Sequence, residues 1–210
     1  MRYNGLIFDL DGTLSDPKEG ITKCVNYSLI KHGYEEQCVE KLAPIVIGPP
    51  LDESFKVLTN VTDSAHIGSL VTSYRERYAD LGFRENMLYD GIVEILEQFK
   101  SKDVRMGVCT SKPERFAGPI LEMFGLIDYF EFLSGGDVGI QKGTQIKALL
   151  DEKHICTNWI MIGDRKHDLI AANENGLPSA GVLWGYGSHE ELSAHAPNYV
   201  LEKTEDLLML

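Results

Sequence analysis

The stretch LIFDLDGTL, residues 6–14, decides the fold of this chain. It begins with apolar residues typical of a strand buried on both faces, and its glycine predicts an immediate turn. Asp9 and Asp11 therefore stand at the end of a buried strand, where desolvation and mutual repulsion both disfavour negative charge. Such a pair needs compensation, and the rest of the sequence points to a divalent cation and a phosphate group.

Short apolar runs recur along the chain and predict buried parallel strands. Including the first strand, these runs are GLIFDL (5–10), VRMGVCT (104–110), FEFLS (130–134), WIMIGD (159–164) and AGVLWG (180–185). Helical apolar spacing lies between the later runs, around residues 92–99, 120–124, 146–150 and 169–173. Asp90 is expected to cap the first of these helices, and Gly125 and Gly176 to end the second and fourth. This alternation predicts an α/β fold with a doubly wound, Rossmann-like parallel sheet.

The first connection is far longer than a crossover needs. From Asp16 to about Arg84 no strand run is evident, and the sequence predicts helices over residues 17–31, 39–42, 51–58 and 64–81, with Pro17 as a first helical residue. We interpret residues 16–83 as an inserted all-helical cap domain, and residues 1–15 and 84–210 as a discontinuous core. The alternative is a long crossover packed flat on the sheet.

Composition excludes some partners. Hydrophobic residues make up 43% of the 210 residues, charged residues 25%, and the formal net charge is −12, which argues against broad contact with nucleic acid and against a basic membrane-surface helix. No apolar stretch has the length of a signal peptide or a membrane span, so a cytoplasmic location is expected. The four cysteines are far apart and are expected to be free thiols: Cys24, Cys38, Cys109 and Cys156.

Polar residues gather where the predicted strands end, and in open α/β sheets ligands bind beyond those ends. The candidates are Asp9, Asp11, Gly12, Thr13, Thr110, Ser111, Asp164 and Asp168, with Lys142 in a loop-to-helix junction between them. Carboxylates, a hydroxyl and a lysine suit a phosphoryl group bound with Mg²⁺, an ion that takes few carboxylates and several waters. Small phosphorylated metabolites are therefore the expected partners.

The spacing of Asp9 and Asp11 allows each carboxylate a different chemical role. Side chains two residues apart on a strand lean the same way, so Asp9 could attack phosphorus while Asp11 handles a proton. Gly12 and Thr13 would let backbone amides approach phosphate oxygens. Each feature has a plainer explanation when taken alone, because Thr-Ser can satisfy backbone groups and GDRKHD can form a turn and a helix cap. The signal is their order along successive strand ends.

Four of these segments carry a resemblance to a known family. FDLDGTLSD resembles the first motif of the haloacid dehalogenase superfamily, CTSKP with Thr110 the second, Lys142 the third and IGDRKHD the fourth. The segments IGPPLDESF (47–55) and GVLWGYGSHEEL (181–192) look like the phosphoglycolate phosphatase-like branch with a helical cap. The resemblance runs through nearly the whole chain, and its first motif is the specific one.

The resemblance implies roles for the matching residues. Asp9 would be the nucleophile that becomes phosphorylated, and Asp11 the general acid and base whose backbone carbonyl also binds the metal. Thr110 would hydrogen-bond the phosphoryl oxygens with help from the Ser111 amide, and Lys142 would neutralise their charge. The metal would be held further by Asp164 directly and by Asp168 directly or through water.

The third and fourth motifs depart from the common family pattern. Lys142 is followed by glycine where many relatives have proline, and Lys147 is a competitor inside the helix. Arg165, Lys166 and His167 stand between the last two aspartates, either as a solvated helix start or to reach a second acidic group of a substrate.

Substrate choice should depend on the cap. Candidate contacts are Lys23, Tyr27, Lys56 and Arg75, with the stretch from Gly48 to Leu51 as a facing loop, although a solvated helix face explains Lys23 and Tyr27 equally.

The function that these features predict is a Mg²⁺-dependent phosphatase of small phosphomonoesters, first of phosphoglycolate. Alternatives are a 5′-nucleotidase of the same superfamily, then a sugar phosphomutase, and last a non-catalytic receiver-like regulator. Thr13 counts against the mutase, because mutases of the superfamily tend to have an apolar residue there. Asp11 counts against the regulator, which has no use for a second, proton-carrying aspartate. A monomer or a homodimer is expected.

Overall fold

The computed structural model describes residues 2–136 and 140–210. These residues divide into two compact units. The first comprises the described residues of the ranges 1–16 and 88–210, and the second comprises Pro17–Met87. The role of the second unit as a cap stays a prediction.

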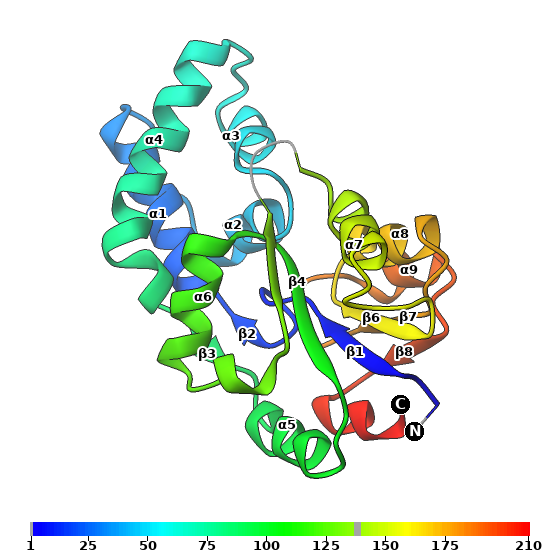
Figure 1. Cartoon of the computed structure of the whole chain (residues 1–210). Coiled ribbons are helices and arrows are strands. Elements are labelled where there is room, and N and C mark those ends of the chain that lie inside the picture. Colours follow the sequence, from blue (N-terminus) through cyan, green and yellow to red (C-terminus); the bar gives the residue numbers. More distant parts are fainter. Residues whose placement is uncertain (1, 137–139) are drawn as a thin grey trace. The chain divides into compact units, whose positions relative to one another are not determined.

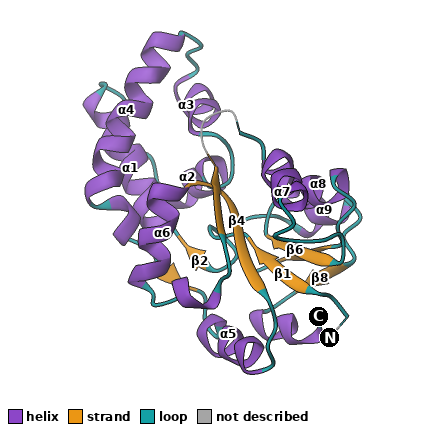
Figure 2. Cartoon of the chain, viewed as in Figure 1, coloured by secondary structure: helices purple, strands orange, loops and turns teal. Residues whose placement is uncertain are grey.

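A six-stranded parallel sheet forms the centre of the first unit (Figures 1 and 2). Its strands, in spatial order, are β5 (Leu133–Gly136), β4 (Met106–Pro113), β1 (Gly5–Phe8), β6 (Trp159–Gly163), β7 (Ser179–Val182) and β8 (Tyr199–Leu201). β1 lies centrally because it pairs with β4 on one side and β6 on the other, so that Leu6 is opposite both Met106 and Ile160. The strand order reverses at β1, which confirms the doubly wound α/β fold.

Helices surround this sheet. They are α5 (Ile92–Ser101), α6 (Glu114–Met123), α7 (Lys142–Asp151), α8 (Lys166–Glu174) and α9 (His189–Ser193), with 3₁₀ turns η2 (Ile127–Tyr129) and η3 (Thr204–Met209). α7 packs beside α8 and against β4 and β5, while α8 packs against β6 and β7. Gly125 and Gly176 follow α6 and α8 with φ of 69° each, the left-handed conformation expected for glycines that end helices.

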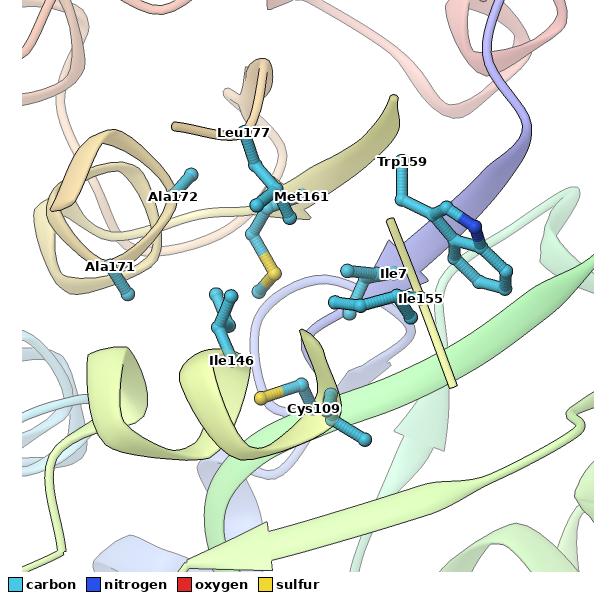
Figure 3. Close-up of a cluster of buried hydrophobic side chains, with 10 residues drawn as sticks. Ile7, Cys109, Ile146, Ile155, Trp159, Met161, Ala171, Ala172 and Leu177 are labelled. Carbon is cyan, nitrogen blue, oxygen red and sulfur yellow. The ribbon is translucent and has the colours of Figure 1, made fainter. Parts of the chain in front are cut away.

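The buried side chains explain why β1 is apolar throughout. Ile7, Cys109, Trp159 and Met161 belong to one cluster that also includes residues of α7 and α8 (Figure 3). Side chains alternate along a strand, so Leu6 and Phe8 project from the opposite face, and both are also fully buried. With both faces covered, no position of this strand is left for a polar side chain until Asp9.

The second unit is helical and has its own core. Its helices are α1 (Lys18–Lys31), α2 (Val39–Val46), α3 (Leu51–Thr59) and α4 (Ser64–Asp80), followed by the 3₁₀ turn η1 (Gly82–Arg84). α1 packs against α4 and α2, and α3 packs against α4, which buries Val25, Phe55 and Leu70 completely. Among the described residues, no helix has both the length and the apolar character that crossing a membrane requires.

Helix boundaries differ from the sequence expectations in three places. Pro17 occupies the N-cap of α1 rather than its first helical position. α2 continues to Val46 and contains Pro44, so it is longer than the helix that the sequence predicts over residues 39–42. Gly91, with φ of 80°, is the N-cap of α5, so the prediction that Asp90 caps this helix is wrong. The carbonyl of Asp90 instead accepts a hydrogen bond of 2.7 Å from the Thr204 hydroxyl.

The strand predictions need corrections too. β5 begins three residues later than expected, because its pairing with β4 starts only at Leu133, after η2. β8 was missed, and so were β2 (Ser15–Asp16) and β3 (Met87–Leu88), which form a separate two-stranded sheet. Two- and three-residue strands are too short to show a period in the sequence.

Candidate active site

The candidate site lies where β1, β4 and β6 reach their carboxyl ends. Asp9 directly follows β1, Thr110 lies within β4, and Asp164 directly follows β6. These three strands are neighbours in the sheet, so residues more than 50 positions apart in the sequence converge there. All three side chains are buried.

Lys142 connects two of the aspartates. It is the first residue of α7, only 5% exposed, and its Nζ lies 3.0 Å from Asp9 Oδ1 and forms an ion pair with Asp168. Asp168 also caps α8, because its Oδ2 accepts a 3.0 Å hydrogen bond from the Arg165 amide. Burial raises the pKa of Asp168 to about 6, against the lowering effect of Lys142. Burial opposes the charge on Lys142, but Asp168 and Asp9 together raise its pKa above the ordinary value.

Three carboxylates form an acidic cluster: each of Asp9, Asp164 and Asp168 offers an oxygen, and these oxygens lie within 4.8 Å of one another. Asp164 Oδ2 accepts a 2.8 Å hydrogen bond from the Tyr186 amide, whereas its Oδ1 is buried and has no partner among the described residues. Burial, then Asp168 and Asp9, raise the pKa of Asp164 well above its usual range. A buried, unpaired carboxylate oxygen beside two further carboxylates fits a divalent cation, which prefers oxygen ligands.

Asp11 lies outside the acidic cluster and forms an ion pair with a different lysine, Lys112. Its Oδ2 lies 2.7 Å from Lys112 Nζ, and the two side chains are 19% and 7% exposed. Asp11 Oδ1 is buried and has no hydrogen-bond partner among the described residues. Burial raises the pKa of Asp11 in spite of Lys112, which acts to lower it.

The charges of these side chains do not balance by themselves. Asp9, Asp164 and Asp168 are three buried carboxyl groups, and Lys142 is the lysine that contacts two of them. Buried negative charges are costly unless they are paired, which favours a bound cation at this cluster.

The turn after β1 brings its backbone against Asp164. Gly12 has φ of +84°, and a Cβ there would lie 2.1 Å from Asp164 Oδ2, so both the conformation and the space require glycine. The amides of Gly12 and Thr13 donate to the carbonyls of Ser15 and Leu10, so in this structure they hold the turn. The Thr13 hydroxyl is buried and unpartnered among the described residues.

Thr110 is held from two directions. Its Oγ1 accepts a 3.2 Å hydrogen bond from the Lys112 amide, and its carbonyl accepts one of 3.2 Å from Gln145 Nε2. Ser111 beside it is exposed. Gln145 was not singled out from the sequence, although its position three residues after Lys142 on α7 places it on the same helix face.

The loop that follows β7 forms hydrogen bonds to the turn after β1 and to Asp164. Trp184 Nε1 donates a 3.0 Å hydrogen bond to the Thr13 carbonyl, and Tyr186 donates its hydroxyl to Asp16 as well as its amide to Asp164. Sequence reasoning gave this segment no role in the site. The one signal was the glycine on each side of Tyr186, since a glycine often marks a close backbone approach.

The competing basic residues lie elsewhere. Lys147 pairs with Asp151 on the surface of α7, while Lys142 is the lysine that reaches Asp9. Arg165 pairs with Glu191 at 3.0 Å, and its neighbours Lys166 and His167 are exposed. At this helix start Arg165 is therefore half-buried against Glu191, whereas Lys166 and His167 are exposed.

The candidate cap contacts all belong to the second unit. Lys23 pairs with Glu19 and Glu85, and Lys56 with Asp52 and Glu53. The Tyr27 ring faces Lys31, and Arg75 is half-buried. Their contact with a substrate stays a prediction.

We expect Asp164→Asn to stabilise the metal-free protein at pH 7.5 by about 1–3 kcal/mol, because it removes a buried charge. The raised pKa means that the folded protein binds a proton here more readily than the unfolded chain does. The wild-type protein therefore gains stability from this protonated group at low pH and loses it as pH rises. The difference in free energy of unfolding between Asp164→Asn and the wild type should accordingly shrink towards pH 5. Urea unfolding in EDTA measures the difference at both pH values.

The matched control is Asp151→Asn, an exposed aspartate that should change stability by less than about 0.5 kcal/mol. An Asp164→Asn protein less stable than the wild type at pH 7.5 in EDTA would show that this carboxylate is already well paired.

Comparison with known proteins agrees with the geometry. Residues 6–182 match the family described as haloacid dehalogenase-like hydrolase. A 5′-nucleotidase of Pseudomonas aeruginosa is 39% identical over 95% of this chain and 91% of its own length. A phosphoglycolate phosphatase of Vibrio parahaemolyticus is 31% identical over 97% of this chain and 93% of its own length. A crystal structure of a predicted phosphatase from Clostridium acetobutylicum superimposes with a TM-score of 0.91 at 38% identity, and all of both chains is covered.

These matches confirm the resemblance seen in the four motifs. The family match begins at the first residue of LIFDLDGTL and extends past the aspartates of the last motif. Hydrolases of this family that act as phosphatases generally use a divalent metal, and the acidic cluster provides ligands for one. The chain therefore belongs to the haloacid dehalogenase-like hydrolase family, and it is a hydrolase of the phosphatase class.

Proposed function

We propose that the chain is a Mg²⁺-dependent phosphatase that hydrolyses small phosphomonoesters through a phosphoryl group carried on Asp9, with phosphoglycolate as the first candidate substrate. One observation carries the proposal. Asp9 is buried against Lys142 and beside Asp164, whose second oxygen is buried and unpaired among the described residues. This is an arrangement of one nucleophile, one fixed ammonium group and one carboxylate oxygen that can serve as a metal ligand.

The first half-reaction forms a bond between an Asp9 carboxylate oxygen and phosphorus and breaks the bond from phosphorus to the ester oxygen. Protonated Asp11 gives its proton to the departing oxygen, which leaves as an alcohol. Lys142, Thr110 and the Ser111 amide stabilise the charge on the phosphoryl oxygens during transfer.

The second half-reaction reverses the role of Asp11. Its carboxylate takes a proton from a water molecule, whose oxygen attacks phosphorus, and the bond from phosphorus to Asp9 breaks. Inorganic phosphate leaves, and Asp9 and protonated Asp11 are restored for the next cycle.

Asp9, Asp164 and the backbone carbonyl of Asp11 would hold Mg²⁺, with Asp168 acting directly or through water. The ion supplies positive charge for the nucleophile and the phosphoryl oxygens. Asp168 already has both oxygens engaged, one by Lys142 and one by the Arg165 amide, which favours an indirect role.

We further propose that the second unit acts as the cap and selects the substrate. Lys23, Tyr27, Lys56 and Arg75 are its candidate contacts, and residues 48–51 its candidate facing loop. A cap that excludes water during the first half-reaction would prevent loss of the proton from Asp11. The proposed setting is the cytoplasm, with the protein as a monomer or homodimer.

A 5′-nucleotidase is the second candidate, favoured by the 39% identity to the Pseudomonas protein of that name. A sugar phosphomutase and a receiver-like regulator follow. A mutase would return the phosphoryl group to a sugar phosphate, and a regulator would keep it on an aspartate without turnover.

The test is phosphate release from phosphoglycolate, 5′-nucleotides and sugar phosphates, measured with Mg²⁺ and again with EDTA. We expect release that requires the metal and is fastest with phosphoglycolate. Faster release from a nucleotide would favour the second candidate. Interconversion of sugar phosphates without release would establish a mutase, and no reaction with any ester would contradict the proposal.

A further inference from the structure

Lys112 is held in the site although the proposed chemistry gives it no task. It lies in β4 two residues after Thr110, where the pairing between β4 and β5 shifts register between Thr110 and Pro113. Such an irregularity redirects the side chains of a strand. The Lys112 amide donates to the Thr110 hydroxyl at 3.2 Å, and its ammonium group lies 2.7 Å from Asp11 Oδ2.

The ion pair is internal rather than a surface contact. The Lys112 side chain is 7% exposed, compared with 67% for Lys147 in its pair with Asp151. Exposed pairs are loosely held and screened by water, whereas a buried ammonium group stays with its counter-ion because leaving it unpaired is costly. Lys112 therefore fixes the position of the Asp11 carboxylate.

The two oxygens of Asp11 are thereby made unequal. Oδ2 faces the Lys112 ammonium group, and Oδ1 is buried without a hydrogen-bond partner among the described residues. A buried polar atom without a partner in the protein is the atom available to a substrate or a water molecule. Proton transfer requires an oxygen within hydrogen-bond reach and in a fixed orientation.

We infer that Lys112 is a positioning residue that fixes Asp11 through Oδ2, so that Oδ1 is the oxygen that delivers the proton to the departing ester oxygen. This inference rests on the proposed function, because it assigns the orientation of the same general acid. Lys112 acts through Asp11 and does not itself touch the transferred phosphoryl group.

The need for a well-placed general acid depends on the leaving group. An alkoxide must be protonated as it departs, so hydrolysis of an alkyl phosphate needs a well-placed general acid. The p-nitrophenolate ion is stable without a proton, so its departure does not. Loss of Lys112 should therefore slow the first half-reaction with alkyl phosphates and spare it with p-nitrophenyl phosphate.

The experiment compares Lys112→Met with the wild type in single-turnover reactions with glycerol phosphate and p-nitrophenyl phosphate. We expect a fall of about 10–100-fold in the rate of alcohol release and less than about a 3-fold change in the burst of p-nitrophenol. Lys112→Arg should recover most of the lost rate because it retains the positive charge. Lys147→Met is the matched surface control and should behave as the wild type.

Circular dichroism establishes that each variant is folded, and Lys112→Gln replaces Lys112→Met if the latter is not. Equal losses with both esters, no loss with either, or a faster Lys112→Met enzyme would overturn the inference while leaving the phosphatase proposal intact. A wild-type protein that releases product from neither ester, nor from phosphoglycolate, a 5′-nucleotide or a sugar phosphate, would instead overturn the proposed function, and the inference with it.

Discussion

Lys142→Met is expected to lower the free energy of unfolding by about 3–5 kcal/mol and to abolish measurable turnover. The substitution removes the ammonium group shared by Asp9 and Asp168, both of which are buried. Two buried carboxylates are then left without their cation, which costs far more than the loss of a surface pair. The same group stabilises the transferred phosphoryl oxygens, so stability and catalysis should fall together. Chemical unfolding in EDTA and phosphate release in Mg²⁺ measure the two effects.

Lys147→Met is the control for this variant. It lies five residues later on the same helix and pairs with Asp151 in solvent, so its stability should change by less than about 0.5 kcal/mol. A Lys142→Met protein as stable and as active as this control would show that the acidic cluster does not depend on its lysine.

Gly185→Ala is expected to reduce turnover by about 100-fold and to destabilise the protein by about 1–3 kcal/mol. A Cβ at this position would lie 2.3 Å from Asp164 Cβ and 2.3 Å from the Gly12 carbonyl oxygen, far inside van der Waals contact. Relief requires a shift of Asp164 or of the turn that follows β1. Either shift displaces the acidic cluster, and small displacements in a catalytic site have large effects on rate. Steady-state kinetics and urea unfolding test the prediction.

Gly68→Ala provides the contrast. A Cβ at this position within α4 meets nothing within 4 Å, and alanine is favoured over glycine in a helix by about 0.5–1 kcal/mol. This variant should be at least as stable as the wild type and fully active. If Gly185→Ala also keeps wild-type activity, the loop after β7 does not position Asp164.

The order of aspartates along the strand ends made the core of the site predictable. In a parallel sheet the carboxyl ends of neighbouring strands meet at one edge, so Asp9 and Asp164 converge once their strands are recognised. Lys142 was predictable for the same reason, since the helix that it begins follows a strand in the same sheet. The parallel sheet itself follows from apolar runs that only burial on both faces explains.

The supporting contacts could not be predicted in the same way. The contact of Lys112 with Asp11 depends on a register shift in β4, which has no sequence signature of its own. The hydrogen bond from Tyr186 to Asp164 depends on the path of a loop between β7 and α9, and loops are fixed by tertiary contacts rather than by periodicity. The prediction that Asp90 caps α5 was wrong because Gly91 occupies the N-cap position, with a positive φ that only the local turn determines.

The most direct test of the account is to look for the phosphoryl group on Asp9. The protein is mixed with a phosphomonoester and Mg²⁺, quenched in acid during turnover, digested, and mapped by mass spectrometry. We predict phosphate on the peptide that contains Asp9, sensitive to hydroxylamine as an acyl phosphate is, and neither phosphate nor turnover in Asp9→Asn. Turnover at the wild-type rate in Asp9→Asn would contradict the account, because the phosphoryl group would then reach water without passing through this carboxylate.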